Sequence, residues 1–266
     1  MNAGIVTATT GRVRRNVEHV MGMPVSVALR GRHADSAIGT QAWAAVVEEL
    51  RGVDRVFSTF RPDSVINRLG RGELGVDDCP PEVNEVLALG QAAEEQSDGY
   101  FSIHLPGRDG RRRLDPSGVV KGWAVERAAR LLMALDETDF CLSAGGDMRC
   151  HVADPSLDPW RVGIENPHDP STLLAVVDVR RGAVATSGVV HRGQHLLDER
   201  TGEPIAGVSS VTVIGPSLTW ADIDATAAFV HGPAAADWLQ TRPGEHGLVV
   251  WPDRTTTTID GGRPHA

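Results

Sequence analysis

The sequence predicts an α+β fold in which helices pack against a mostly antiparallel sheet. The first half carries apolar residues at helical spacing in three segments: residues 36–56, residues 80–96 and a stretch that begins near Lys121. From Asp139 onward, short apolar runs bounded by turn residues predict strands. Helices and strands separated along the chain in this way favour an α+β arrangement over alternating βαβ units. No composition change marks a linker, so we expect one domain over residues 1–266.

The first half of the chain also contains one strand and a loop. Residues 23–30 alternate between faces and predict a strand with one buried side. The helix over residues 36–56 is expected to end in a polar loop at residues 57–72. The helix over residues 80–96 begins at prolines, which fit a first turn, and ends at Ser97-Asp98-Gly99.

The second half is expected to form strands with one helical interruption. The helical stretch is residues 222–240, with a break at Gly232-Pro233. The predicted strands are residues 140–144, 161–165, 173–179, 183–187, 210–215 and 248–251. Each is short and is bounded by turn residues, as the strands of an antiparallel sheet are.

Composition indicates an ordinary globular protein and disfavours two classes of partner. Hydrophobic residues make up 41% and charged residues 23% of the chain. A net charge of -9 disfavours nucleic acid or an anionic membrane as the main partner. We interpret the arginine-rich residues 108–113 as a solvated loop, and an anionic ligand beside it is the alternative. The three cysteines form no C-x-x-C pair, and no membrane anchor or signal segment is recognisable, so we expect a cytoplasmic protein.

Lys121 is the only lysine among 26 basic residues. Arginine has replaced lysine elsewhere, so this position stands out as one that favours a compact ammonium group over a planar guanidinium. The alternative is a surface lysine retained by chance.

Asp222 and Thr226 lie four residues apart at the start of the predicted helix, which places both on one face. A carboxylate and a hydroxyl together make a plausible half-site for Mg²⁺, a hard cation that prefers oxygen ligands and commonly bridges to phosphates. The alternative is that Asp222 caps the helix while Thr226 packs inward. We interpret Asp224 as a solvated acid at the helix start.

Three glycine-containing turns could allow a phosphate-bearing ligand to approach the backbone: Ser117-Gly118, Gly145-Gly146-Asp147 and Thr186-Ser187-Gly188. None matches G-x-G-x-x-G or a P-loop, which disfavours a Rossmann or Walker site. Hairpins would need such turns in any case.

His195 lies three residues before Asp198 and ahead of a tight turn, which makes it a candidate general base. A surface histidine beside a turn-capping aspartate is the alternative. His191 precedes it by four residues, but no helix and no third soft ligand support a zinc site here.

In their order along the chain, these motifs resemble the ApbE family of FAD:protein FMN transferases. Residues 115–126 are similar to the family's D-L-G-G-I-A-K-G-Y-A-V-D segment and include Lys121. The resemblance extends from about residue 21 to residue 232. The other matching elements are residues 21–23, 57–69, 99–102, 142–147, 186–188, 195–204 and 221–227.

The resemblance implies an activity and a set of site residues. Such enzymes cleave the FAD pyrophosphate with Mg²⁺, attach FMN to a threonine or serine of an acceptor flavoprotein, and release AMP. It implies that His195 is the base and that Mg²⁺ is held by Asp222, Thr226 and the carbonyl of Gly118. The FAD contacts that it implies are Met21, Phe60, Tyr100, Phe101, Ser102, Asp115, Lys121 and Ile205.

This chain departs from the family pattern at three places. Ser102 stands where the family usually has aspartate, Glu199 follows Asp198 in place of proline, and the loop between Gly188 and His195 is short. Two alternatives to transfer stay open: an FAD pyrophosphatase that yields FMN and AMP, and a flavin-binding protein without turnover. His195 favours transfer, and the pair Asp222 and Thr226 disfavours a pure binding protein.

Overall fold

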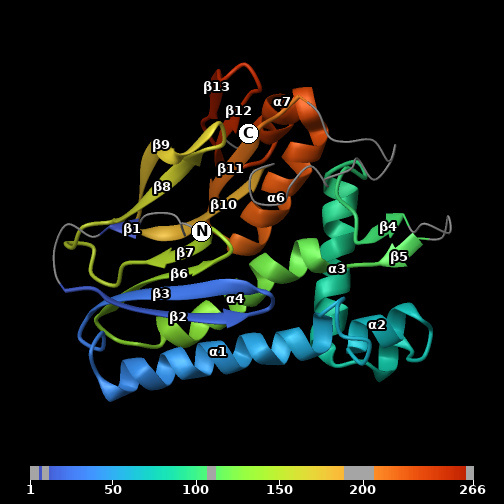
Figure 1. The fold of residues 1–266 in the computed structure, drawn as a ribbon, viewed down its shortest axis with the longest axis horizontal. Helices are drawn as coiled ribbons and strands as arrows, with labels where there is room; N and C mark the ends of the chain where they lie inside the picture. Colours follow the sequence, from blue (N-terminus) through green and yellow to red (C-terminus); the bar gives the residue numbers. More distant parts are fainter. Residues whose placement is uncertain (1–5, 8–11, 107–111, 189–206, 262–266) are drawn as a thin grey trace.

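The computed structural model describes residues 6–7, 12–106, 112–188 and 207–261. Its centre is an eight-stranded sheet in the order β13-β12-β11-β10-β7-β6-β3-β2, and every described strand pairing is antiparallel (Figure 1). The strands of this sheet are β2 (Arg14–Val20), β3 (Met23–Gly31), β6 (Thr138–Ala144), β7 (Asp147–His151), β10 (Arg181–Gly188), β11 (Ser210–Gly215), β12 (His246–Val250) and β13 (Thr256–Ile259). The predicted α+β class is therefore confirmed.

Two small sheets flank the large one. A three-stranded ribbon has the order β1-β8-β9, and a two-stranded hairpin pairs β4 with β5. Their bounds are β1 (Val6–Thr7), β8 (Trp160–Asn166), β9 (Asp169–Val179), β4 (His104–Pro106) and β5 (Arg112–Leu114). Figure 1 shows the β4–β5 hairpin beside α3, on the opposite side of the molecule from the β8–β9 ribbon.

Four of the six described α-helices contact the large sheet, the other two pack on those helices, and the main core lies between the helices and the sheet (Figure 1). α4 contacts both α1 and α6, while α6 packs on β10 and β11. The described helices are α1 (Ala37–Phe57), α2 (Val65–Gly70), α3 (Pro81–Gln96), α4 (Ser117–Met133), α6 (Leu218–His231) and α7 (Ala235–Gln240), with short 3-10 turns η1 (Val76–Asp78) and η3 (Gly232–Ala234). α4 is therefore the central helix of this layer.

The predicted helices form close to their expected ends. Ser36 caps α1 by accepting the amide of Gly39 at 3.1 Å. α3 ends where Asp98 and Gly99 adopt positive φ angles of 52° and 78°. The break at Gly232 separates α6 from α7, as expected. Among the described residues, no helix is both long enough and apolar enough to cross a bilayer.

Some local predictions were wrong. The expected polar loop contains the short helix α2, because Ser64 caps it by accepting the amide of Asn67. The segment Thr186-Ser187-Gly188 is no turn but the end of β10, where it pairs with β11. Six strands were missed because their sequences are short or polar, namely β1, β2, β4, β5, β7 and β13; β2, for example, is an exposed edge strand.

Two tight hairpins bring the ends of four strands to one edge of the sheet. Met21 and Gly22 connect β2 to β3 with φ angles of 55° and 73°. Gly145 and Gly146 connect β6 to β7 with φ angles of 59° and 101°. Two residues with positive φ match the right-handed twist of paired strands, and glycine adopts them without strain. The second turn places Asp147 as the first residue of β7.

Candidate functional site

Lys121 lies between two buried carboxylates, Asp147 and Asp222. Its Nζ atom is 3.1 Å from Asp222 Oδ1 and also contacts Asp147 Oδ2. The side chain of Lys121 is 14% exposed, and each aspartate side chain is 2% exposed. Taken by themselves, these two carboxylates and one ammonium carry one net negative charge. Buried negative charge is stabilised by a nearby cation, so the three side chains could help to hold one.

Asp147 was missed as a charged site residue. The sequence pointed to its turn as a place where a phosphate could approach the backbone and as part of the matching element 142–147, but not to the carboxylate itself. In the fold, Asp147 is the first residue of β7 and accepts the amide of Thr186 in β10 at 3.0 Å. Its position opposite Lys121 depends on strand pairing and helix packing, which no local pattern reveals. The carboxylate and the helix are brought together only in three dimensions.

Gly122 sets the distance between α4 and α6. A Cβ at this position would lie 2.8 Å from the carbonyl oxygen of Leu218 and 3.0 Å from the Cβ of Asp222. The Gly122 amide donates to Asp222 Oδ2 at 3.1 Å. The two helices therefore approach closely because this residue has no side chain, and the contact orients the Asp222 carboxylate.

The hydrogen bond from the Gly122 amide to Asp222 also bears on the carbonyl of Gly118. In a regular helix the amide of residue 122 pairs with the carbonyl of residue 118. Asp222 also accepts this amide, so any hydrogen bond from the Gly122 amide to the Gly118 carbonyl is shared. Gly118 itself packs on the ring of Phe101, where an added Cβ would be 3.0 Å from the nearest ring atom. The carbonyl of Gly118 stays a predicted ligand.

Thr226 is half-buried and hydrogen-bonded to β10. Its Oγ1 atom is 3.0 Å from Ser187 Oγ, so the helix face that carries Asp222 and Thr226 is turned toward the sheet. Asp222 lies in the second turn of α6, because the helix begins at Leu218. The alternative in which Asp222 caps this helix is therefore wrong.

Asp224 is buried, which contradicts its interpretation as a solvated acid. Its Oδ2 atom accepts Arg242 Nε at 3.0 Å, and its carboxyl is hydrogen-bonded to that of Glu245. Burial, followed by the neighbouring charge of Asp224, raises the pKa of Glu245 to about 8. Burial also raises the pKa of Asp224. We missed this cluster because Arg242 and Glu245 are distant from Asp224 in sequence.

We expect Glu245 to make stability fall between about pH 5 and pH 8. The folded protein keeps the Glu245 proton up to about pH 8, whereas an unshifted glutamate releases it near 4.5, so the stabilisation present at low pH is lost through this window. Urea unfolding of Glu245→Gln should show a shallower decline, by up to roughly 1 kcal/mol per pH unit. Glu73→Gln, which removes an exposed carboxylate, is the control. Equal slopes in wild type and Glu245→Gln would contradict this assignment.

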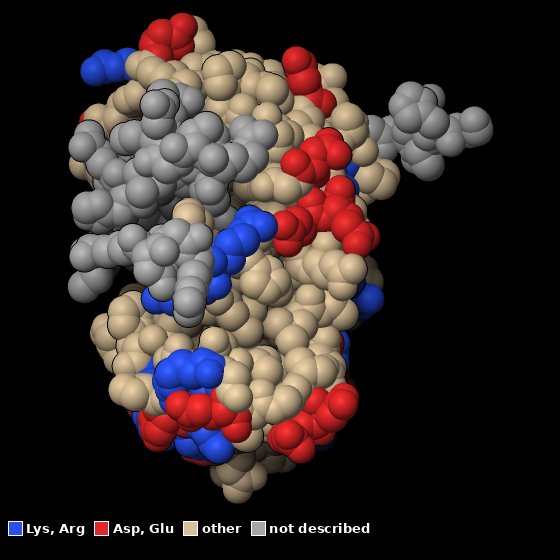
Figure 2. Space-filling view, turned by 90° about the vertical axis from the view of Figure 1, so that its right-hand side faces the viewer, with Lys and Arg blue, Asp and Glu red and all other residues tan. Residues whose placement is uncertain are grey.

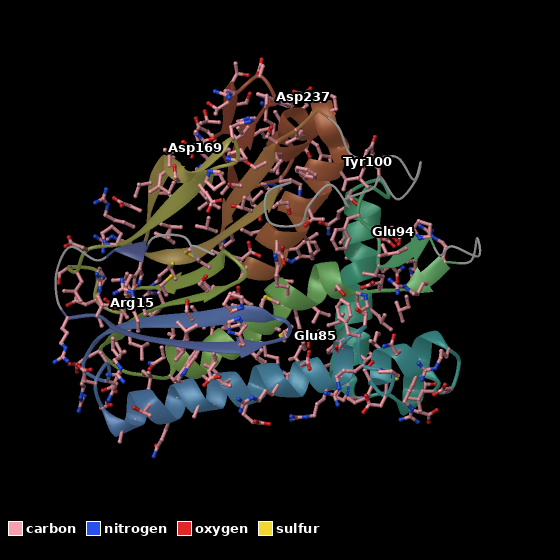
Figure 3. All side chains as sticks on the ribbon, viewed as in Figure 1. Arg15, Glu85, Glu94, Tyr100, Asp169 and Asp237 are labelled. Carbon is pink, nitrogen blue, oxygen red and sulfur yellow. The ribbon has the colours of Figure 1, made fainter. Side chains whose placement is uncertain are left out.

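Tyr100 belongs to an aromatic stack that reaches Arg242, the ion-pair partner of Asp224. Its ring lies 3.6 Å from that of His231 with an interplanar angle of 17°. His231 stacks in turn on Trp238 at 4.9 Å, and Arg242 Cζ lies 5.4 Å from the Trp238 ring centroid. Figure 3 places Tyr100 at the end of α3 that is nearest to α7. The stack therefore fixes Tyr100 from one side.

Asp115 lies directly before α4 and helps to cap it. Its carboxylate accepts the amide of Ser117 at 3.2 Å and pairs with Arg113 at 2.9 Å. Arg112 lies 3.9 Å from Glu94. Figure 2 shows basic and acidic side chains beside each other on one face of the molecule. Arg112 and Arg113 of the predicted basic loop thus lie in strand β5, which contradicts the loop prediction for these two residues, and both face acidic neighbours.

The remaining predicted FAD contacts differ widely in exposure. Phe60 is 95% exposed in the loop between α1 and α2, whereas Phe101 is buried in the core. Ser102 is buried, and its hydroxyl accepts the amide of His104 at 3.0 Å. Met21 occupies the β2–β3 turn. The structure thus brings together Lys121 with Asp222, and Phe101 with Gly118; His195 and Ile205 lie outside the described residues.

Comparison with known proteins identifies the family. The model of the ApbE family matches residues 21–107 and 102–249. A curated relative from Klebsiella pneumoniae is 30% identical over 67% of this chain and 55% of its own length, and one from Vibrio cholerae is 33% identical over 74% and 62%. Both are named FAD:protein FMN transferase. The matched region thus spans little more than half the length of these relatives.

Solved structures show the same fold. The ApbE protein of Thermotoga maritima superposes with a TM-score of 0.77 at 22% identity and covers 94% of this chain and 97% of its own. The flavinyl transferase ApbE of Pseudomonas stutzeri gives a TM-score of 0.78 at 24% identity, with 94% and 96% covered. Together with the family match over most of its length, this shows that the chain belongs to the ApbE family.

Proposed function

We propose that this protein is a Mg²⁺-dependent FAD:protein FMN transferase. It would cleave the pyrophosphate of FAD, attach FMN to a threonine or serine of an acceptor flavoprotein, and release AMP. The observation that carries the proposal is the buried cluster of Lys121, Asp147 and Asp222, in which an ammonium and two carboxylates meet at the contact between α4, α6 and β7. The names of the curated relatives support the choice of FAD as substrate.

The residue types proposed as ligands fit Mg²⁺. In the described part of the chain no group of three or more histidine, cysteine or acidic residues is placed to hold a metal, so the proposed site relies on one carboxylate together with a hydroxyl and a backbone carbonyl. The ligands would be Asp222, Thr226 and the carbonyl of Gly118, which are hard oxygen donors. Bound Mg²⁺ would supply charge neutralisation at the pyrophosphate oxygens.

The chain's own residues would position the substrate. Phosphoryl transfer asks mainly for alignment and electrostatic stabilisation. The ammonium of Lys121 can face phosphate oxygens as a compact charge, and Tyr100 and the exposed Phe60 offer ring surfaces to flat heterocycles. His195 stays the predicted base for the acceptor hydroxyl. We also propose the cytoplasm as the compartment, since the three cysteines of the sequence form no C-x-x-C pair and no even-numbered set.

One assay separates transfer from the alternatives. The protein is incubated with FAD, Mg²⁺ and an acceptor flavoprotein from a neighbouring gene, and AMP and covalent flavin fluorescence are measured. Both products are expected. AMP without a labelled acceptor would indicate a pyrophosphatase, and FAD binding without either product would indicate a flavin-binding protein.

We expect His231→Ala to weaken FAD binding about 5- to 10-fold, because Tyr100 loses the ring on which it stacks. Flavin fluorescence titration measures the Kd. His151→Ala removes a comparable stack on Phe140, in the sheet, and should leave the Kd unchanged. The same Kd in wild type and His231→Ala would exclude a role for this stack in FAD binding.

A further inference from the structure

Glu126 joins the three elements that carry the buried cluster. It lies on α4, and its Oε2 atom accepts the amide of Leu218 at the start of α6 at 2.6 Å. Its Oε1 atom accepts Arg149 Nε, from β7, at 2.9 Å. The side chains of Glu126 and Arg149 are 19% and 12% exposed. A charged pair that is shielded from solvent to this degree holds its geometry better than one on the surface.

The N-terminus of α6 depends on this contact. Its capping residue, Ser217, makes no side-chain hydrogen bond to the helix, and the first turn contains no acidic residue. The first amides of a helix have no partner within the helix and favour a negative charge. Glu126 provides both the acceptor and the charge from a different helix. It therefore fixes where α6 begins relative to α4.

The three joined elements hold the proposed cation site. Leu218 lies one turn before Asp222, Arg149 lies two residues after Asp147, and Lys121 shares α4 with Glu126. The close contact at Gly122 also involves the backbone of Leu218. A shift of the α6 N-terminus would therefore move Asp222 away from Lys121 and from the carbonyl of Gly118.

We propose that Glu126 is a positioning residue that sets the placement of Asp222 and so the affinity for Mg²⁺. It acts through Leu218 and Arg149 rather than by touching the cation or FAD. This inference rests on the proposed function, because it assumes a cation site at Asp222. It predicts that removal of Glu126 weakens Mg²⁺ binding while FAD binding without Mg²⁺ is retained.

The test measures Mg²⁺ and FAD binding separately by calorimetry. Glu126→Ala is expected to raise the Mg²⁺ Kd about 10- to 100-fold, as loss of a residue that orients a ligand does, and to leave the metal-free FAD Kd within about 2-fold. Glu126→Gln keeps an oxygen acceptor for Leu218 and should lie between wild type and Glu126→Ala, and it serves if the alanine variant fails to fold. In turnover assays the Mg²⁺ concentration for half-maximal rate should rise in the same order.

Glu49→Gln is the matched control. Glu49 lies on α1 and pairs at 2.5 Å with Arg127, which follows Glu126 on α4. This ion pair therefore joins α4 to α1, whereas Glu126 joins α4 to α6. The Mg²⁺ Kd of Glu49→Gln should stay within about 2-fold of wild type. The role of Glu126 would be contradicted if the Mg²⁺ Kd stayed unchanged in whichever Glu126 variants fold. It would also be contradicted if Glu49→Gln raised the Mg²⁺ Kd as much as the Glu126 variants do. Either result would leave the proposed function itself standing. If wild type itself binds no Mg²⁺, the metal-dependent function fails and this role fails with it.

Discussion

Lys121→Met is expected to lower the free energy of unfolding by about 3–5 kcal/mol, measured by urea denaturation at neutral pH without divalent cations. The substitution keeps most of the side-chain volume but removes the ammonium between Asp147 and Asp222. Both carboxylates are buried, so water cannot replace the lost charge. Breaking a buried ionic cluster by removal of one member is among the most destabilising single changes.

Arg127→Met provides the control for this experiment. Arg127 lies on the same helix and forms an ion pair with Glu49, but both side chains are partly exposed. Pairs of this kind contribute about 0–1 kcal/mol. Equal losses in the two variants, or no loss in Lys121→Met, would show that burial of the cluster has no energetic consequence. Lys121→Arg tests whether a larger, planar cation fits between the two carboxylates. We expect its free energy of unfolding to lie between those of Lys121→Met and wild type.

Asp222→Asn is expected to reduce transfer about 100- to 1,000-fold while the protein stays folded. The amide keeps the size of the carboxylate and can still accept the Gly122 amide, but it removes the charge that would hold Mg²⁺. Loss of one preorganised electrostatic contact at a reacting phosphate has an effect of this order. AMP release from FAD in the presence of Mg²⁺ and the acceptor is the measurement.

Asp237→Asn serves as the control for charge alone. Asp237 is an exposed acid on α7, near the same end of the molecule as α6 (Figure 3). Its substitution should leave turnover within about 2-fold of wild type. If Asp222→Asn kept full transfer activity, Asp222 would be excluded as a Mg²⁺ ligand.

Local sequence patterns predicted the helices well because the residues that start and end a helix act on neighbours within a few positions. Ser36 caps α1, and Asp98 and Gly99 end α3, through contacts within a few residues. The same reasoning failed for Asp224, whose partner Arg242 lies 18 residues away. It also failed for α2, where a serine cap outweighs a polar composition.

The candidate site was predicted in part, and the missing part is its three-dimensional environment. The motifs singled out Lys121 and Asp222, but their contact at 3.1 Å depends on the close packing of α4 and α6 at Gly122. Asp147 joins them only through the pairing of β7 with β10. Long-range contacts of this kind follow from tertiary packing, so periodicity and spacing cannot reveal them.

The central proposal is that the buried cluster of Lys121, Asp147 and Asp222, whose own side chains carry one net negative charge, helps to hold Mg²⁺. The most direct test is the thermal midpoint of wild type, Lys121→Met and Asp222→Asn as Mg²⁺ is added. At about 100 times Kd, a bound ligand stabilises by about 2.7 kcal/mol, or several degrees for a chain of this length. We predict such a rise for wild type, a larger rise for Lys121→Met, and none for Asp222→Asn. Equal rises in all three proteins, or no rise in wild type, would contradict the account.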